Sequence, residues 1–152
     1  MTIEDLVDVF ASSGYNGRQL GEAAKLYAKM IKENATICTE NGKPIISMFS
    51  TTWCPHCKWA KDPFAQAVDG YVKQGKIVAH NWELDVNDDA LTSANESSVP
   101  ESENEIYNEF NPGGTIPTFV FGCKYYRIGS GHETEDDKDA ERREFYFTQG
   151  GC

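Results

Sequence analysis

The sequence predicts an α/β protein in which helices flank one mixed central β-sheet, with a helical extension at the N-terminus. Three observations carry this prediction. The spacing of apolar residues is helical over the first 35 residues and becomes that of strands from residue 36 onward. A Cys-x-x-Cys sequence stands where an apolar strand gives way to a helix. The remaining elements follow in the order βαβ and then ββα, which is typical of a sheet covered by helices.

Composition limits the classes of partner. The chain of 152 residues has 24 acidic and 14 basic residues, a net charge of −10, and a length that suits about one domain. A surface with this much negative charge repels phosphate backbones and anionic lipid headgroups. We therefore expect neither nucleic acid nor a membrane as a partner. No apolar run approaches the ~20 residues of a membrane span. The acidic N-terminus does not resemble a signal peptide, which leads us to expect a cytoplasmic protein.

The N-terminal extension is assigned to residues 1–35. Its apolar residues recur at helical spacing on either side of a break at Ser12-Ser13-Gly14. We expect two amphipathic helices that pack on the domain behind them, and we assign that domain to residues 36–152.

The domain itself is expected to begin with strands at 36–39 and 44–49, joined by an Asn-Gly turn. The Cys-x-x-Cys then opens a helix that runs to Lys73 and is closed by Gly75. A buried strand is expected within 76–86.

The second half of the domain starts with a polar, acidic segment, 87–114. A helix is expected there over 102–110, because Ser102 and Glu105 have the spacing of a capping box. A hairpin of two strands follows, at 118–121 and 125–128. The last helix, with Thr134 as its cap, is expected to end near Phe147, and the acidic run within it reads as a solvated face.

Cys54 and Cys57 are the residues predicted to carry chemistry, within the run Trp53-Cys54-Pro55-His56-Cys57. The free N–H groups and the dipole of a helix N-terminus favour negative charge, so a Cys54 thiolate is stabilised there. Pro55 fits the first turn, where its missing N–H costs nothing. Cys57 lies one turn deeper, which makes Cys54 the exposed attacking thiol and Cys57 the buried resolving thiol. A protonated His56 would add positive charge beside the pair.

The other cysteines bear on a competing interpretation, because a Cys-x-x-Cys is also typical of half a zinc site. The sequence has no second pair, since Cys38, Cys123 and Cys152 stand alone. We expect Cys38 to be a small apolar strand residue and Cys123 to occupy a hairpin tip. His80 and His132 are expected to be strand and loop residues, so no metal site is predicted.

Two segments resemble the motifs of the thioredoxin superfamily, and the resemblance covers about residues 36–148. The first is the run from Trp53 to Cys57, and the second is Gly-Thr-Ile-Pro-Thr-Phe at 114–119. In this family the proline of the second motif is cis and faces the cysteines, so the resemblance implies a cis bond before Pro117. It also implies a thioredoxin-like fold and thiol–disulfide exchange with protein substrates.

The same resemblance assigns roles around the two cysteines. Cys54 and Cys57 are the implied catalytic residues, and the redox-active disulfide between them replaces any separate cofactor. The residues implied to tune them are Trp53, Pro55 and His56. The implied substrate-binding segment is Ile116, Pro117 and Thr118. A reductase or glutathione must then recharge the enzyme.

The sequence departs from the family around the resolving thiol. The family's buried aspartate corresponds to Met48 and its lysine partner to Asn81. Proton transfer at Cys57 must therefore use water, His56 or Glu83. The Cys-Pro-His-Cys sequence resembles that of disulfide-forming oxidants of bacteria, whereas the Ile-Pro sequence and the expected location resemble reductases.

We favour a thioredoxin-like reductase over three alternatives. A glutaredoxin-like, glutathione-dependent enzyme is supported by the short hairpin and by Gly129-Ser130-Gly131 before acidic residues. A metal or iron–sulfur module would use the Cys-x-x-Cys with a partner chain. A non-catalytic interaction domain would leave the cysteine pair inert.

Overall fold

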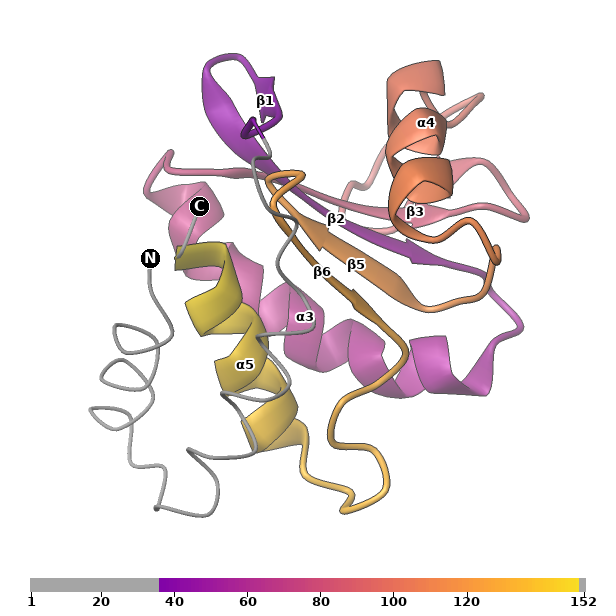
Figure 1. Ribbon diagram of the computed structural model, residues 1–152, viewed down its shortest axis with the longest axis vertical. Coiled ribbons are helices and arrows are strands. Elements are labelled where there is room, and N and C mark those ends of the chain that lie inside the picture. The colour runs from indigo at the N-terminus through magenta and orange to yellow at the C-terminus, as the bar shows by residue number, and fades with distance from the viewer. Residues whose placement is uncertain (1–35, 151–152) are drawn as a thin grey trace.

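The computed structural model describes residues 36–150, which form a mixed β-sheet with helices on both of its faces (Figure 1). The predicted extension at 1–35 and Cys152 lie outside the described residues. The elements in chain order are β1 (Thr39–Glu40), β2 (Lys43–Ser50), α3 (Pro55–Lys73), β3 (Val78–Glu83), β4 (Asp88–Asp89), α4 (Glu101–Phe110), β5 (Thr118–Phe121), β6 (Tyr125–Ile128) and α5 (Lys138–Gly150).

The sheet topology brings the two sequence motifs to one edge. The strand order is β4-β3-β2-β5-β6, with β2 and β3 parallel, the other neighbours antiparallel, and β1 paired with β2. Since β2 and β5 are antiparallel, the end of β2 lies beside the start of β5, where Phe49 pairs with Thr118. The helix that carries Cys54 and Cys57 follows β2, and Pro117 precedes β5. The motifs therefore meet although about 60 residues separate them.

Alternation along β2 divides the apolar core into two clusters, one on each face of the sheet. Ile46 and Met48 face α3 and α5, where Phe64 and Phe145 pack edge to face with ring centroids 5.6 Å apart. Phe49 lies on the opposite face and packs against Tyr107 of α4. Met48 is fully buried in the cluster that faces α3, so this side of the sheet is apolar at that point.

Several predicted elements are confirmed. The hairpin strands begin and end where the alternation placed them, and α3 extends to Lys73 with Gly75 beyond it at φ 71°. This positive φ suits glycine, which ends the helix without a steric penalty. The strand predicted within 76–86 is β3, and it is shorter than expected.

Two predicted helix caps are wrong. Helix α4 begins at Glu101 after Pro100 and has no side-chain cap, so the capping box of Ser102 and Glu105 does not form. Helix α5 begins at Lys138, where Asp137 Oδ1 accepts the N–H of Ala140 at 3.0 Å. The segment before it is held by tertiary contacts, described below, that a local pattern does not encode.

Cys38 and Cys123 are joined by a disulfide, so the expectation that they stand alone is wrong. Their Cα atoms are 5.4 Å apart although 85 positions separate them in sequence. The backbone brings them together, because the Cys38 N–H donates to the Gly122 carbonyl at 2.9 Å. Cys38 lies just before β1 rather than within a strand, and Cys123 occupies the hairpin turn as predicted.

Removing this disulfide should lower the free energy of unfolding. The chain-entropy model gives about 4–5 kcal/mol for a closed loop of this length, and measured losses are commonly about 2–5 kcal/mol. For the double variant Cys38→Ser/Cys123→Ser we expect a loss of about 2–4 kcal/mol, measured by urea denaturation against the oxidised parent. The parent protein with this disulfide reduced is the matched control, and it should unfold at the same urea concentration as the variant. Equal stability of the variant and the oxidised parent would show that the bond does not constrain the unfolded chain.

Candidate functional site

The Cys54 side chain caps the N-terminus of α3. Cys54 is the N-cap residue, with extended backbone angles, and its Sγ accepts the N–H of Cys57 at 3.2 Å. Pro55 follows at the first helical position, as the sequence predicted. A sulfur in this place accepts a backbone N–H and lies at the positive end of the helix dipole.

The two thiols are about equally buried, which corrects the expectation of an exposed Cys54. Cys54 is 3% exposed and Cys57 is 2% exposed. Both belong to the apolar cluster under α3, and the partly buried Ile116 packs against that cluster. The Cys54 sulfur is directed at the Cys57 N–H of the first helical turn.

Cys57 is strongly disfavoured as a thiolate. Burial is the main cause, and with a hydrogen bond to the Cys54 side chain it raises the pKa of Cys57 to about 12. The backbone hydrogen bond at Thr51 lowers the pKa of Cys57, but by less than burial raises it. A resolving thiol in this environment needs help to lose its proton.

The peptide bond between Ile116 and Pro117 is cis, as the resemblance implied. The Pro117 carbonyl accepts the N–H of Gly129 at 2.8 Å, which ties the loop to the end of β6. Ile116 packs against the apolar clusters on both faces of the sheet. The Thr118 side chain is fully buried and donates to the Thr115 carbonyl, so any contact of Thr118 with a substrate would come from its backbone.

His56 is held on the outer side of the helix start. Its Nδ1 lies 2.7 Å from a Glu133 carboxylate oxygen, and its side chain is 65% exposed. The Ser130 hydroxyl also donates to the His56 carbonyl at 3.3 Å, and Trp59 Nε1 donates to Asp136 at 3.1 Å. The acidic loop after β6 therefore packs on the start of α3. The sequence pattern gave no sign of this contact, because the partners are 77 positions apart.

Trp53 lies beside the pair and is 67% exposed, so it is the most exposed large apolar side chain among the described residues. An exposed indole ring is unfavourably hydrated, and this cost is removed when another molecule covers the ring. This exposure is consistent with a surface that meets another molecule.

A buried ion network anchors the acidic loop. Arg127 pairs with Glu141 and, at 2.6 Å from Nη1 to Oε1, with Glu144. The His132 ring lies 2.7 Å from Glu144. Burial alone would raise the pKa of Glu144, but Arg127 and His132 hold it below its usual value. Glu141 is fully buried, so the predicted solvated acidic face is wrong at this residue.

The glycines that suggested a glutaredoxin-like enzyme have structural roles here. Gly129 has φ 85°, which turns the chain out of β6. A Cβ on Gly131 would lie 2.7 Å from Arg127 Nη1 and 3.4 Å from a Glu144 oxygen, so only glycine leaves room for the ion network. The arrangement of these glycines is therefore explained without a glutathione site.

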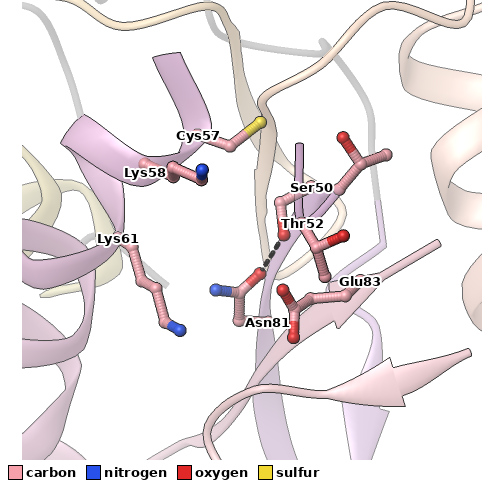
Figure 2. Close-up of a pocket in the computed structure, with 8 residues that line it drawn as sticks. Ser50, Thr52, Cys57, Lys58, Lys61, Asn81 and Glu83 are labelled. Carbon is pink, nitrogen blue, oxygen red and sulfur yellow. Dashed lines mark hydrogen bonds between the residues drawn. The ribbon is translucent and has the colours of Figure 1, made fainter. Parts of the chain in front are cut away.

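A polar cavity of about 120 Å³ lies behind Cys57, between α3 and the ends of β2 and β3 (Figure 2). Within its lining the Ser50 hydroxyl donates a hydrogen bond to Asn81 Oδ1 at 2.7 Å. The residues that line it are Ser50, Thr51, Thr52, Cys57, Lys58, Lys61, Asn81 and Glu83.

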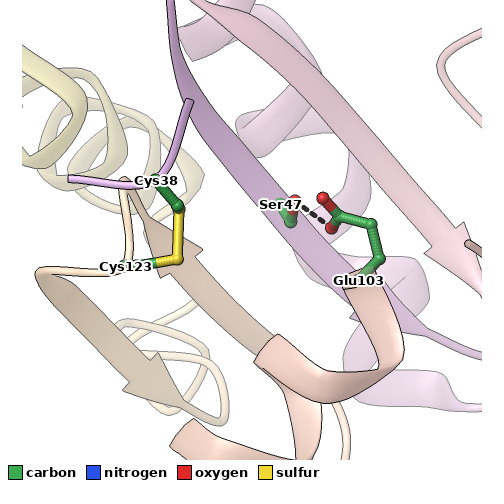
Figure 3. Close-up of a disulfide and its surroundings, with 4 residues drawn as sticks. All are labelled: Cys38, Ser47, Glu103 and Cys123. Carbon is green, nitrogen blue, oxygen red and sulfur yellow. Dashed lines mark hydrogen bonds between the residues drawn. A yellow bond between two sulfur atoms is a disulfide. The ribbon is translucent and has the colours of Figure 1, made fainter. Parts of the chain in front are cut away.

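A second polar cluster lies toward the other end of β2, near the disulfide (Figure 3). The Ser47 hydroxyl donates to Glu103 at 2.8 Å, and burial raises the pKa of the Glu103 carboxyl. His80 lies 2.8 Å from the buried Asp89. Among residues 36–150, no group of three or more His, Cys, Asp or Glu side chains is arranged to hold a metal ion. Within the same residues, no helix combines the length and apolar character needed to span a bilayer.

No protein-family model, curated protein or solved structure matches the chain. The functional argument therefore rests on the residues and their geometry. What the structure shows is a mixed α/β sheet with a close pair of cysteines at a helix start and a cis-proline loop at the same edge of the sheet.

Proposed function

We propose that this protein is a thioredoxin-like thiol–disulfide oxidoreductase, and more specifically a reductase of protein disulfides. The observation that carries the proposal is the Cys54 sulfur at the N-terminus of α3, with Cys57 one turn on and both thiols free. The cis bond before Pro117 supports it, because Ile116 packs against the apolar cluster that contains both cysteines, at the place where the resemblance implies substrate binding. Trp53 adds an exposed apolar surface at the same place.

The reaction proceeds in two exchanges. The Cys54 thiolate attacks one sulfur of a substrate disulfide, and the other sulfur leaves as a thiolate. Cys57 then attacks Cys54 Sγ, which forms the Cys54–Cys57 disulfide and releases the second substrate sulfur. The enzyme is thereby oxidised and the substrate reduced. An external dithiol, from a reductase, or glutathione returns the pair to the reduced form.

A trapping experiment tests the proposal. Cys57→Ser cannot perform the second exchange, so we expect it to accumulate a mixed disulfide with a disulfide-bonded peptide, visible as a mass increase that dithiothreitol reverses. The double variant Cys54→Ser/Cys57→Ser is the matched control and should form no adduct. The absence of an adduct on Cys57→Ser would overturn the proposal.

The direction of electron flow is set by the reduction potential of the pair. Titration against glutathione should give a value near the about −270 mV of thioredoxin if the protein is a reductase. A value near about −120 mV would make it an oxidant.

The Cys38–Cys123 bond bears on the compartment. Disulfides persist in oxidising compartments and are rare in the cytosol. The cytoplasmic location expected from the sequence therefore requires this bond to be absent or protected in cells. Alkylation of Cys38 and Cys123 in freshly lysed cells would measure which state holds.

A further inference from the structure

The resolving thiol presents a chemical problem that the family's usual residues do not solve here. Cys57 must lose a proton to attack Cys54, yet burial raises its pKa to about 12. The protonated thiol is a poor nucleophile, so the second exchange is slow unless a group removes this proton. Met48 occupies the position of the family's aspartate, is fully buried and cannot accept a proton.

The cavity behind Cys57 is partly open to solvent. Its volume of about 120 Å³ exceeds the space that a water molecule needs. The Ser50 and Thr52 hydroxyls donate to Asn81 and Asp85, whereas the buried Thr51 hydroxyl has no protein partner among the described residues. A space of this size with an unpaired hydroxyl on its lining can hold water.

Only one group on these walls can accept the proton at neutral pH. Asn81 does not titrate, and its Oδ1 is already occupied by the Ser50 hydroxyl. Lys58 and Lys61 carry ammonium groups, which donate hydrogen bonds and have no lone pair to offer. Glu83 is the remaining titratable group of the lining. Figure 2 shows its carboxylate next to Ser50 and Asn81.

His56 is excluded by its position. It does not line the cavity, its ring is on the outer side of the helix, and its Nδ1 is engaged by Glu133. Of the three routes that the sequence left open for the proton, water and Glu83 are the two that the cavity brings together.

We propose that Glu83 accepts the Cys57 proton through water in this cavity, an inference that rests on the proposed exchange reaction. As Cys57 Sγ attacks Cys54 Sγ, the thiol proton passes through water to the Glu83 carboxylate. The new sulfur–sulfur bond forms, the bond from Cys54 to the substrate breaks, and its electron pair leaves with the substrate thiolate. Glu83 is partly exposed and returns the proton to solvent. In the reverse direction its carboxylic acid protonates the departing Cys57.

Charged groups on neighbouring elements lie around Glu83. Lys58 and Lys61 on α3 line the same cavity. Asp88 on β4 pairs with Glu83 in the sheet register. Asp85, two residues along the chain, accepts the backbone N–H of Thr52 at 3.1 Å at the rim.

The test separates the two exchanges. The mixed disulfide is formed rapidly with a disulfide-bonded peptide carrying a fluorophore, and its decay is followed by stopped flow from pH 5 to pH 10. For Glu83→Gln we expect decay at pH 7 to slow by about 10–100-fold, a common effect of losing a general base. The deficit should shrink as pH rises, since hydroxide then takes the proton. The first exchange, measured on Glu83→Gln/Cys57→Ser, should stay within about 2-fold of Cys57→Ser.

Two control variants test whether the effect is specific to the carboxylate of Glu83. Glu105→Gln changes an exposed glutamate of α4 and should leave the pH profile unchanged. Glu83→Asp keeps the carboxylate and should restore much of the decay rate, including its dependence on pH, even if the glutamine variant is unstable. Decay in Glu83→Gln that equals the parent rate at every pH would overturn this inference while leaving the exchange reaction intact. If no mixed disulfide forms at all, the proposed function fails instead.

Discussion

Replacement of Cys54 by serine should lower disulfide exchange by at least about 1000-fold, as expected when a covalent nucleophile is lost. The serine hydroxyl keeps the shape of the cap and can accept the Cys57 N–H that Cys54 Sγ accepts now. It cannot serve as a nucleophile toward sulfur at neutral pH. The folded state should therefore survive while the activity disappears. Reduction of a peptide disulfide with dithiothreitol as the electron donor measures the effect.

The matched control for this prediction is Cys152→Ser, which removes a cysteine outside the Cys-x-x-Cys and should leave the rate within about 2-fold of the parent. Thermal unfolding of both variants shows whether the fold is kept. Exchange by Cys54→Ser above a few per cent of the parent rate would mean that another cysteine performs the first attack.

Replacement of Arg127 by glutamine should have the largest effect on stability. Arg127 is 4% exposed and is the cation that faces both Glu141 and Glu144. Its loss leaves two buried carboxylates without their guanidinium, and the partners that remain for them are the His132 ring and the backbone N–H groups of Gly131 and His132. Breaking a buried ion network from one side costs about 3–5 kcal/mol. We expect a loss of that size in the free energy of unfolding, measured by urea denaturation at pH 7.

Arg142→Gln is the matched control, because Arg142 lies on α5 beside Glu141 and forms an ion pair with the exposed Asp139 at 4.0 Å. An exposed pair of this kind is worth about 0–1 kcal/mol. If both arginine variants lost equally little stability, the carboxylates of Glu141 and Glu144 would have to be neutralised or hydrated in the folded protein.

Elements set by local patterns could be predicted from the sequence. The hairpin strands and the course of α3 follow from alternation, from a proline at the helix start and from a glycine after its end. The cis bond before Pro117 was available from the resemblance to a known motif. These features depend on neighbours within a few residues, which a sequence displays directly.

Features set by distant contacts could not be predicted. The disulfide joins residues 85 positions apart, and neither Cys38 nor Cys123 carries a local sign of its partner. The same holds for the contact of His56 with Glu133. The two-residue β4 is too short for any alternation to appear, and it exists because Trp82 and Glu83 offer their backbone to Asp88 and Asp89. Cys54 likewise lies in a buried cluster that includes residues distant in sequence, such as Phe119 and Phe145.

The two outer strands of the sheet protect the molecule against aggregation. On one side the outermost strand is β4, whose two residues are both aspartates. On the other it is β6, where Arg127 points into the protein and binds the buried glutamates. Short, charged edges and inward-facing charges discourage pairing with a strand from a second molecule. The outermost strands β4 and β6 therefore offer little free edge to a strand from a second molecule of this protein.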